Sequence, residues 1–296
     1  MKSKLIAIFV FLQLAAWCAA ASFPLCMYGV NRTQDLKTIK DAGFNCFQTY
    51  KQDPKLMSAL AKEAQKQNLQ IVFYPQPLLK AGNEEMLKAA QNWPVLAWYI
   101  YDEPDVASAA PIAIAALNAK VKAALPSHQT ALVIGQGKTK NNYYALADIL
   151  MVDWYPVPHL PLISFGEQVA LARQGLKKNK AQNKPLWAVL QIFDWKEYKQ
   201  YRPDDDRIGR FPTETEIRFM AYDAIFNGAN GLFYFIFTSN GLPLPKAKPQ
   251  NWAEIKDINL ELSKISPFFS DGKRIKNPVR LSSPLKAMTW QLEGTA

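Results

Sequence analysis

The chain has 296 residues, of which 49% are hydrophobic, enough for one large domain with a sizeable core. Its formal net charge is +10, but the lysines are scattered over segments with helical spacing and no arginine-rich patch occurs. This pattern favours solvated helix faces and argues against a nucleic-acid partner. Only two histidines occur and no histidine–cysteine cluster has metal-ligand spacing, so we expect no metal and no cofactor.

Residues 1–21 have the pattern of a signal peptide. Lys2 and Lys4 form a basic start, residues 5–16 are apolar but too short to span a bilayer, and residues 19–21 are alanines suited to cleavage. An uncleaved membrane anchor is the alternative. The sequence therefore predicts an exported protein, periplasmic or secreted, without stable membrane insertion after cleavage. It leaves the oligomeric state open.

From residue 24 the chain alternates between apolar runs and lysine-rich segments with helical spacing. Eight apolar runs have the length of buried strands, namely 25–30, 44–50, 69–75, 95–102, 130–135, 149–155, 186–193 and 231–237. Eight strands alternating with eight helices predict an α/β fold, a (β/α)8 TIM barrel over residues 22–270. A doubly wound open sheet is the alternative. It is weakened because no glycine-rich dinucleotide turn follows the first strand.

Two cysteines remain after export, Cys26 and Cys46, in predicted neighbouring strands. The compartment permits a disulfide between them. Adjacent barrel strands rarely carry one, however, so two buried thiols are the slightly favoured expectation. The pair therefore indicates little about function.

Residues 271–296 differ in composition from the rest of the chain and include a strand-like run at 285–292. A strand without a partner is not a stable ending. We therefore predict a short C-terminal β extension, which either pairs back on the barrel or begins an accessory β-domain.

The predicted fourth strand ends abruptly in Asp102, Glu103 and Pro104. Proline cannot donate a ladder hydrogen bond and disfavours helical torsions in the residue before it, so the strand should stop there. The two carboxylates then lie at the carboxyl end of a core strand, where barrel enzymes keep their catalytic groups. Burial and the neighbouring charge should raise the pKa of Glu103. The alternative is a solvated acid pair that caps the next helix.

The carboxyl ends of barrel strands converge on one mouth, so the residues there form a candidate site. They are carboxylates, amides and aromatic rings: Tyr50, Tyr74, Gln76, Asp102, Glu103, Gln136, Asp153, Tyr155, Gln191, Trp195 and Tyr234. Such groups suit the hydroxyls and C–H face of a sugar, and two carboxylates can cleave a glycosidic bond. Each aromatic taken alone is more often a packing residue. Asp153 has a structural alternative beside the Tyr155-Pro156 turn.

At these residues the chain resembles the barrel glycoside hydrolases of the large retaining clan that includes β-galactosidases, mannanases and cellulases. The clan's fourth strand is aromatic and ends in Asn-Glu-Pro, and residues 98–104 match it with Asp102 in place of the asparagine. Residues 151–156 resemble the clan's sixth strand. Residues 221–232 are similar to the last helix and strand of exported barrel hydrolases. The resemblance implies glycoside hydrolysis with Glu103 as general acid/base.

The seventh strand departs from the clan pattern, because Gln191 stands where the clan has its nucleophilic glutamate. Glutamine cannot form a glycosyl ester. Asp153 or Asp194 then supplies the second carboxylate, or hydrolysis is lost. We predict an exported glycoside hydrolase that acts on an oligosaccharide or polysaccharide. Inversion is favoured over retention, which stays open, with Glu103 as acid, Asp153 as base and space for a water between their carboxyls. The alternative is a non-hydrolytic carbohydrate-binding protein, and the sugar itself is left open.

Overall fold

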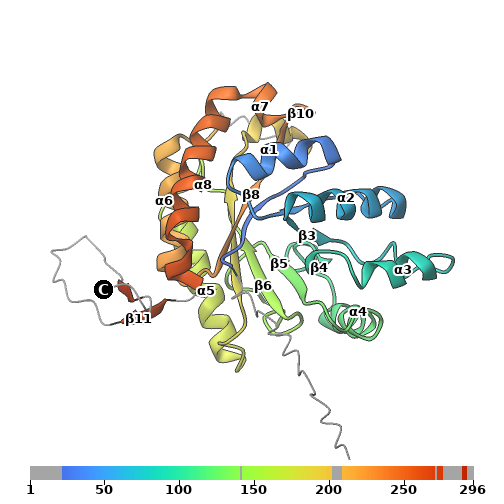
Figure 1. Ribbon diagram of the computed structural model, residues 1–296. Coiled ribbons are helices and arrows are strands. Elements are labelled where there is room, and N and C mark those ends of the chain that lie inside the picture. The colour runs from blue at the N-terminus through green and yellow to red at the C-terminus, as the bar shows by residue number, and fades with distance from the viewer. Residues whose placement is uncertain (1–21, 141, 202–208, 271, 276–288, 292–296) are drawn as a thin grey trace, which may run out of the picture.

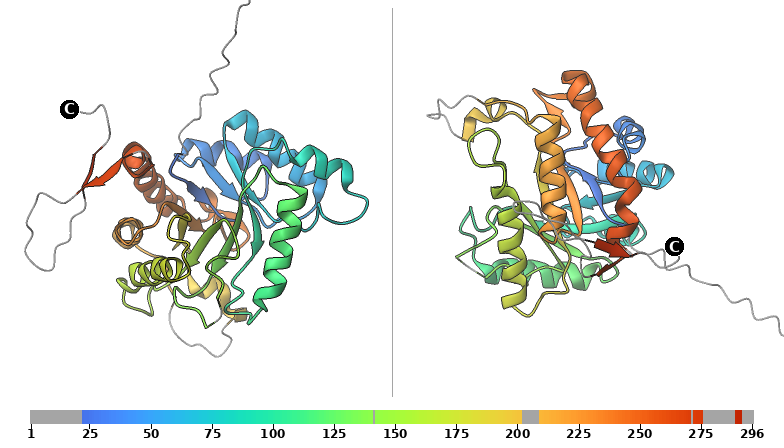
Figure 2. Two further views of the ribbon diagram at one scale, coloured as in Figure 1. Left: turned by 90° about the horizontal axis from the view of Figure 1, so that it is seen from below. Right: turned by 90° about the vertical axis from the view of Figure 1, so that its left-hand side faces the viewer.

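The computed structural model describes residues 22–140, 142–201, 209–270, 272–275 and 289–291. Eight parallel strands close into a barrel in the order of the sequence, and Figures 1 and 2 show the helices arranged around it. The strands are β1 (Leu25–Met27), β2 (Cys46–Gln48), β3 (Gln70–Phe73), β4 (Val95–Tyr101), β5 (Thr130–Ile134), β6 (Ile149–Asp153), β7 (Leu186–Gln191) and β8 (Gly231–Phe235). The predicted (β/α)8 barrel is confirmed.

The strands are apolar throughout because both of their faces are buried. Alternate residues of each strand point into the barrel, where Val72, Ala97 and Met151 belong to one buried cluster. The residues between them face the helices and belong to a second, larger cluster. Strict alternation therefore decides which side chains at the strand ends reach the mouth.

The helical elements are η1 (Thr33–Asp35), α1 (Leu36–Asp41), α2 (Pro54–Gln67), α3 (Glu84–Ala90), α4 (Pro111–Ala124), α5 (Ser164–Lys178), η2 (Trp195–Tyr201), α6 (Glu214–Phe226), α7 (Leu244–Ala247) and α8 (Pro249–Ser270). Local sequence sets several of their starts. Asp53 caps α2 through a 2.8 Å hydrogen bond from the Leu56 amide. Thr213 and Glu216 form a reciprocal capping box at α6.

The connection between β5 and β6 differs from the expected eight-helix pattern, because its described residues form no helix. Two tyrosines fill the space instead. Tyr143 donates a 2.7 Å hydrogen bond to the Ala109 carbonyl, and Tyr144 donates one of 3.1 Å to the Gly137 carbonyl. The glycines and polar residues of this connection favour turns over a helix.

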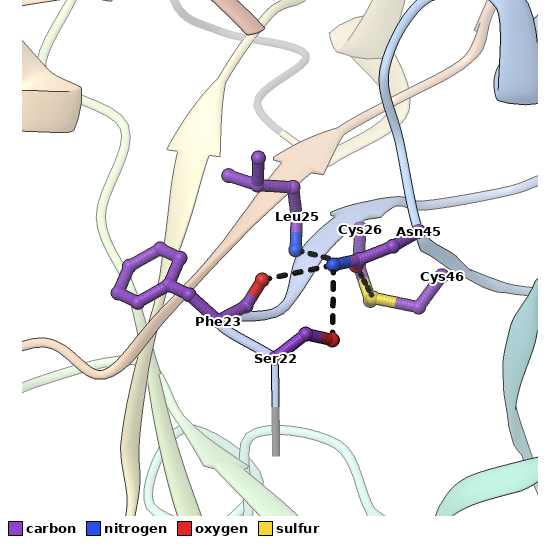
Figure 3. Close-up of a disulfide and its surroundings, with 6 residues drawn as sticks. All are labelled: Ser22, Phe23, Leu25, Cys26, Asn45 and Cys46. Carbon is purple, nitrogen blue, oxygen red and sulfur yellow. Dashed lines mark hydrogen bonds between the residues drawn. A yellow bond between two sulfur atoms is a disulfide. The ribbon is translucent and has the colours of Figure 1, made fainter. Parts of the chain in front are cut away.

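Cys26 and Cys46 form a disulfide, so the expectation of two free thiols is wrong (Figure 3). The two residues are direct register partners on β1 and β2, and both point into the barrel, with their Cα atoms 4.5 Å apart. This separation lies within the range that a disulfide requires. Beside the disulfide, the Asn45 side chain holds the start of β1. It accepts a hydrogen bond from the Leu25 amide and donates one to the Phe23 carbonyl.

After β8 the chain forms a small hairpin of β9 (Thr238–Ser239) and β10 (Leu242–Pro243), then α7 and the long α8, which lies beside α6 (Figure 1). The C-terminal β extension is present as β11 (Lys273–Ile275) paired antiparallel with β12 (Thr289–Gln291). Trp290 of β12 packs on Phe269 of α8. The rest of the predicted 285–292 run, like the predicted signal peptide, lies outside the described residues.

Within the described part of the chain, every helix is too short or too polar to cross a membrane.

Candidate active site at the mouth of the barrel

The end of β4 carries two consecutive carboxylates that face different partners. The pairing of β4 with β5 shifts register between Tyr99 and Tyr101. Glu103 then has a left-handed backbone with φ of 45°, which is uncommon for a residue other than glycine and is found at functional sites. The turn directs Asp102 towards Tyr99 and Tyr74, and Glu103 towards β5 and β6.

The loop after β4 is fixed to the end of β5. Asp105 accepts hydrogen bonds from the backbone amides of Gly135 and Gln136, both at 3.0 Å. The Glu103 amide donates to the Val133 carbonyl at 3.2 Å. The Glu103 carboxyl lies against Gly135, where an added Cβ would come within 3.0 Å of its Oε1. Its position is therefore set by backbone contacts on both sides.

Glu103 and Asp153 are in direct contact, hydrogen-bonded through their carboxyls. Asp153 is 7% exposed. Burial, followed by the charges of Glu103 and Asp102, raises the pKa of Asp153 well above its usual value. Burial, and then the charge of Asp102, also raises the pKa of Glu103, as the sequence predicts.

Two adjacent buried carboxyls cannot both ionise cheaply, so the raised pKa values of Glu103 and Asp153 favour a proton kept on the pair. Asp153 Oδ2 accepts a 3.1 Å hydrogen bond from the Tyr155 hydroxyl. Asp153 Oδ1 is buried and accepts no hydrogen bond from the described residues.

The inverting geometry that we expect from sequence is absent. An inverting pair needs its carboxyls about 6.5–9.5 Å apart so that a water fits between them. Glu103 and Asp153 do face each other at one mouth, but they are hydrogen-bonded to each other. Asp153 therefore does not hold a water between itself and Glu103 as a general base.

Asp102 ends a chain of tyrosine hydroxyls. Tyr28 donates to the Tyr99 hydroxyl at 3.3 Å, and Tyr99 donates to Asp102 Oδ1 at 2.8 Å. Tyr74 is a second hydroxyl partner of Asp102. Burial raises the pKa of all three tyrosines, so they stay protonated as donors. Asp102 itself is exposed at the mouth; burial of its inner side raises its pKa, and the two tyrosine hydrogen bonds lower it.

Aromatic rings surround these carboxyls. Tyr74 packs on Tyr50 at 6.1 Å and on Tyr99 at 5.0 Å between ring centroids. On the opposite side Tyr155 packs on Phe193 at 5.0 Å and on Trp195 at 6.2 Å. The four predicted aromatics Tyr50, Tyr74, Tyr155 and Trp195 therefore come together around the mouth. Partly exposed rings beside carboxylates suit the C–H face and the hydroxyls of a sugar.

Gln191 is a structural residue in this fold. It is fully buried, its Oε1 accepts from the Val157 amide at 2.8 Å, and its Nε2 donates to the carbonyls of Val157 and Phe193. These hydrogen bonds join the end of β7 to the loop after β6. Its predicted contact with substrate is therefore not supported, because both ends of the amide are engaged with backbone.

The side chain of Tyr234 points out of the barrel towards the helices, so its predicted place at the mouth is wrong. It alternates with the inward-facing Phe233, so its ring points towards the helices and packs edge-on against Phe44 at 5.2 Å. Gln76 is half-buried and donates to the Ile100 carbonyl at 3.0 Å. Gln136 is exposed, and its backbone amide is the group held by Asp105.

Sequence reasoning missed Tyr28, Tyr99 and Asp105. The first two carry a recognisable signal, because period-two counting from Cys26 and Ala97 places both rings inside the barrel. No local pattern indicates that Asp105 reaches across to β5.

The barrel also has a cavity of about 540 Å³ at its other end, between α5 and α6. Arg173, Lys184, Asn227 and Asn230 contribute to its lining, and it contains none of the predicted site residues. Arg173 and Lys184 donate to backbone carbonyls that join this end of the barrel. We assign this cavity to the structural end of the fold.

Comparison with solved structures identifies the same barrel in glycoside hydrolases. The chain is similar to a β-galactosidase from Bacillus circulans sp. alkalophilus (TM-score 0.59, 11% identity, 85% of this chain and 58% of that one). It is similar to a β-galacturonidase from Eisenbergiella tayi (TM-score 0.54, 14% identity, 81% of this chain and 51% of that one). A putative α-L-fucosidase from Bacteroides thetaiotaomicron matches over its whole length (TM-score 0.54, 12% identity, 89% of this chain and 100% of that one).

These likenesses show the TIM-barrel fold and do not by themselves assign a reaction. The chain spans about half the length of the Eisenbergiella enzyme. No protein-family model and no curated protein matches the sequence.

Proposed function

We propose that this chain is an exported glycoside hydrolase in which Glu103 protonates the oxygen of the leaving group. The observation that carries the proposal is the pair of neighbouring carboxyls, Glu103 and Asp153, at the mouth of the barrel, where burial and mutual charge raise both pKa values. A general acid must be protonated near its working pH, and burial beside another carboxyl achieves this. The glycosidase-like barrel and the aromatic surroundings support a carbohydrate substrate.

Glu103 and Asp153 differ in exposure, and we assign them different roles. Asp153 is buried and acts as the partner that keeps a proton on the pair. Glu103 is the more open member and reaches the glycosidic oxygen. As that bond breaks, Glu103 gives its proton to the departing oxygen, while water adds its hydroxyl to the anomeric carbon and returns a proton to the carboxyl pair.

Carbohydrate binding without turnover is the second candidate, and one observation favours it. Gln191 at the end of β7 is engaged with backbone groups, and Asp194, which follows it, accepts a 2.9 Å hydrogen bond from the Lys196 amide of its own loop. A barrel of this kind can retain the sugar-binding rings after losing catalysis. Product analysis with a panel of glycans separates the two functions, because only the hydrolase releases reducing sugar.

The decisive test is Glu103→Gln, which keeps the shape of the side chain and removes the proton donor. We expect turnover on the best substrate of a panel of aryl glycosides and polysaccharides to fall about 10²–10⁴-fold. Glu85→Gln, the same change at an exposed position of α3, is the matched control. An unchanged rate in Glu103→Gln would reject Glu103 as the acid. Binding of glycans without any product would favour the second candidate.

We also propose export, on two supports. The first is the signal-like pattern of residues 1–21. The second is the Cys26–Cys46 disulfide, since such bonds persist in oxidising compartments. The periplasm and the medium both meet this condition.

A further inference from the structure

Asp105 is an acidic residue beside the site that has no part in the proposed mechanism. It lies in the loop after β4, residues 102–110, and its carboxylate reaches across to the end of β5. Oδ1 accepts a hydrogen bond from the Gly135 amide and Oδ2 accepts one from the Gln136 amide, each at 3.0 Å. Because each oxygen holds a different amide, the contact fixes both the distance and the orientation of this loop relative to β5.

Few torsions are free between Glu103 and Asp105. Glu103 has a φ of 45°, and the ring of Pro104 fixes the φ of the next residue. The Glu103 carbonyl accepts hydrogen bonds from the amides of Val106 and Ala107, at 3.1 and 3.0 Å. A left-handed residue other than glycine persists only where its surroundings hold it in place. The turn therefore couples the position of Glu103 to that of Asp105.

Gly135 is in contact with both acids. Its amide donates to Asp105, and a Cβ added to it would lie 3.0 Å from Glu103 Oε1 and 3.4 Å from Glu103 Cδ. The residue that Asp105 binds is thus also the surface on which the Glu103 carboxyl packs. A change at Asp105 should therefore alter the spacing between Glu103 and the end of β5.

The rest of the loop after β4 is held by other contacts. The Tyr143 hydroxyl lies 3.2 Å from the Pro104 carbonyl oxygen and 2.7 Å from that of Ala109. The Glu103 amide donates to the Val133 carbonyl at 3.2 Å. None of these contacts uses the side chain of Asp105. We therefore expect the loop to stay folded when Asp105 is replaced, with the Glu103 carboxyl displaced within the mouth.

We propose that Asp105 is a positioning residue for the general acid, and that its contact with the end of β5 directs the Glu103 carboxyl to the leaving oxygen. This inference rests on the proposed function and adds to it a residue that does not touch the substrate. A catalytic group must be held within about 0.5 Å of its working position, and a misplacement of about 1 Å can lower the rate about 10²-fold. Asp105 acts through Glu103, so its loss should affect the step that needs a proton from Glu103.

The test is a series of glycosides that share one sugar, the best found for the wild type, and differ in the leaving group. A dinitrophenolate departs without a proton, whereas an alkoxide needs the general acid. We expect Asp105→Ala to lower kcat about 10²-fold on alkyl glycosides, with KM little changed, and to leave the rate on the dinitrophenyl glycoside nearly unchanged. Asp105→Asn keeps one acceptor for the Gly135 amide and should show the same selectivity with a smaller loss.

Gly135→Ala tests the same contact from the β5 side. Its methyl group would lie 3.0 Å from Glu103 Oε1 and 2.8 Å from Val106 Cγ2, so these two side chains must move while the Asp105 hydrogen bonds can stay. We expect the loss of rate again to be confined to the alkyl glycosides. Equal rates for Gly135→Ala and the wild type on alkyl glycosides would contradict the inference, because the acid would then not depend on its packing against β5.

Asp53→Ala is the matched control, since Asp53 also accepts a hydrogen bond from a backbone amide, at the start of α2. It should lower stability and leave the rates on all leaving groups unchanged. Glu103→Gln on the same series should show the strongest dependence on the leaving group. A loss in Asp105→Ala that is equal for all leaving groups, or no loss, would overturn the inference alone. A Glu103→Gln series without this dependence, or a wild type without turnover, would overturn the proposed function and the inference with it.

Discussion

At the scale of single residues, two adjacent acids at the end of β4 have different roles because the backbone turns between them. Glu103 has a positive φ and contacts Asp153, whereas Asp102 contacts Tyr99. Burial and mutual repulsion both raise the pKa of Asp153, so protonation of this group is linked to folding.

Asp153→Asn should show this linkage in stability against pH. The unfolded aspartate has a pKa of about 3.9, and the native pKa lies well above it. Proton binding by Asp153 stabilises the folded wild type. This contribution to the free energy of unfolding has its full value below the unfolded pKa and is lost as pH rises through the native pKa. The stability of Asp153→Asn relative to wild type should therefore increase as pH is raised from about 4, by at most about 1.4 kcal/mol per pH unit.

Urea denaturation across a pH series measures this difference. Asp257→Asn, at an exposed position of α8, is the surface control. A relative stability of Asp153→Asn that stays constant from acid to neutral pH would show that Asp153 is not protonated preferentially in the folded protein.

Gln191→Glu should weaken the fold and should not create a better enzyme. The change removes the amide donor and places carboxylate oxygens against the carbonyls of Val157 and Phe193. We expect a loss of about 1–3 kcal/mol in the free energy of unfolding, from unsatisfied buried groups. Gln65→Glu, at an exposed position of α2, is the matched control. Faster glycoside turnover in Gln191→Glu would indicate a simple lost nucleophile and would contradict our mechanism.

At the scale of elements, neighbouring strands fix side chains that are far apart in sequence. Cys26 and Cys46 meet because β1 and β2 pair in register, and Asp105 meets Gly135 because β4 and β5 are neighbours. The disulfide closes the loop that contains α1, with a sequence separation of 20. A link of this length restricts the unfolded chain substantially.

The double variant Cys26→Ala/Cys46→Ala should therefore lose about 3 kcal/mol in the free energy of unfolding. Denaturant unfolding of the wild type with and without reductant measures the same quantity independently. Reductant should leave the double variant unchanged. If oxidised wild type and double variant unfold at the same denaturant concentration, the disulfide contributes nothing to stability.

At the scale of the whole molecule, the barrel puts all its candidate chemistry at one end. The carboxyl ends of β2, β3, β4, β6 and β7 bring the site residues together. The cavity at the other end contains none of them, and Arg173 and Lys184 in its lining bind backbone carbonyls. The export proposal also belongs to this scale, because it concerns the chain as it is made and delivered.

Expression of the complete chain in a Gram-negative host should yield a mature protein that begins near Ser22, since residues 19–21 are small. Mass spectrometry of the periplasmic fraction and the medium measures both the cleavage point and the location. A version without residues 1–21 is the control and should stay in the cytoplasm. Recovery of the uncleaved chain in the membrane fraction would favour the anchor.

The sequence alone determined the barrel and the place where β4 ends. Eight apolar runs of strand length are a strong periodic signal, and Pro104 marks where β4 must end. Local chemistry likewise predicted the caps of α2 and α6. These features depend on residues close together in the chain, so a local pattern is sufficient to predict them.

Only the tertiary structure decided which groups meet. It paired Cys26 with Cys46, brought Asp153 into hydrogen-bonding contact with Glu103, bound Gln191 to Val157 and turned Tyr234 away from the mouth. Each outcome depends on strand register, on the inward or outward facing of one residue, or on a loop crossing to a neighbouring strand. A shift of one residue in a strand reverses the side that its side chains face, so these contacts follow from three-dimensional packing and not from sequence spacing.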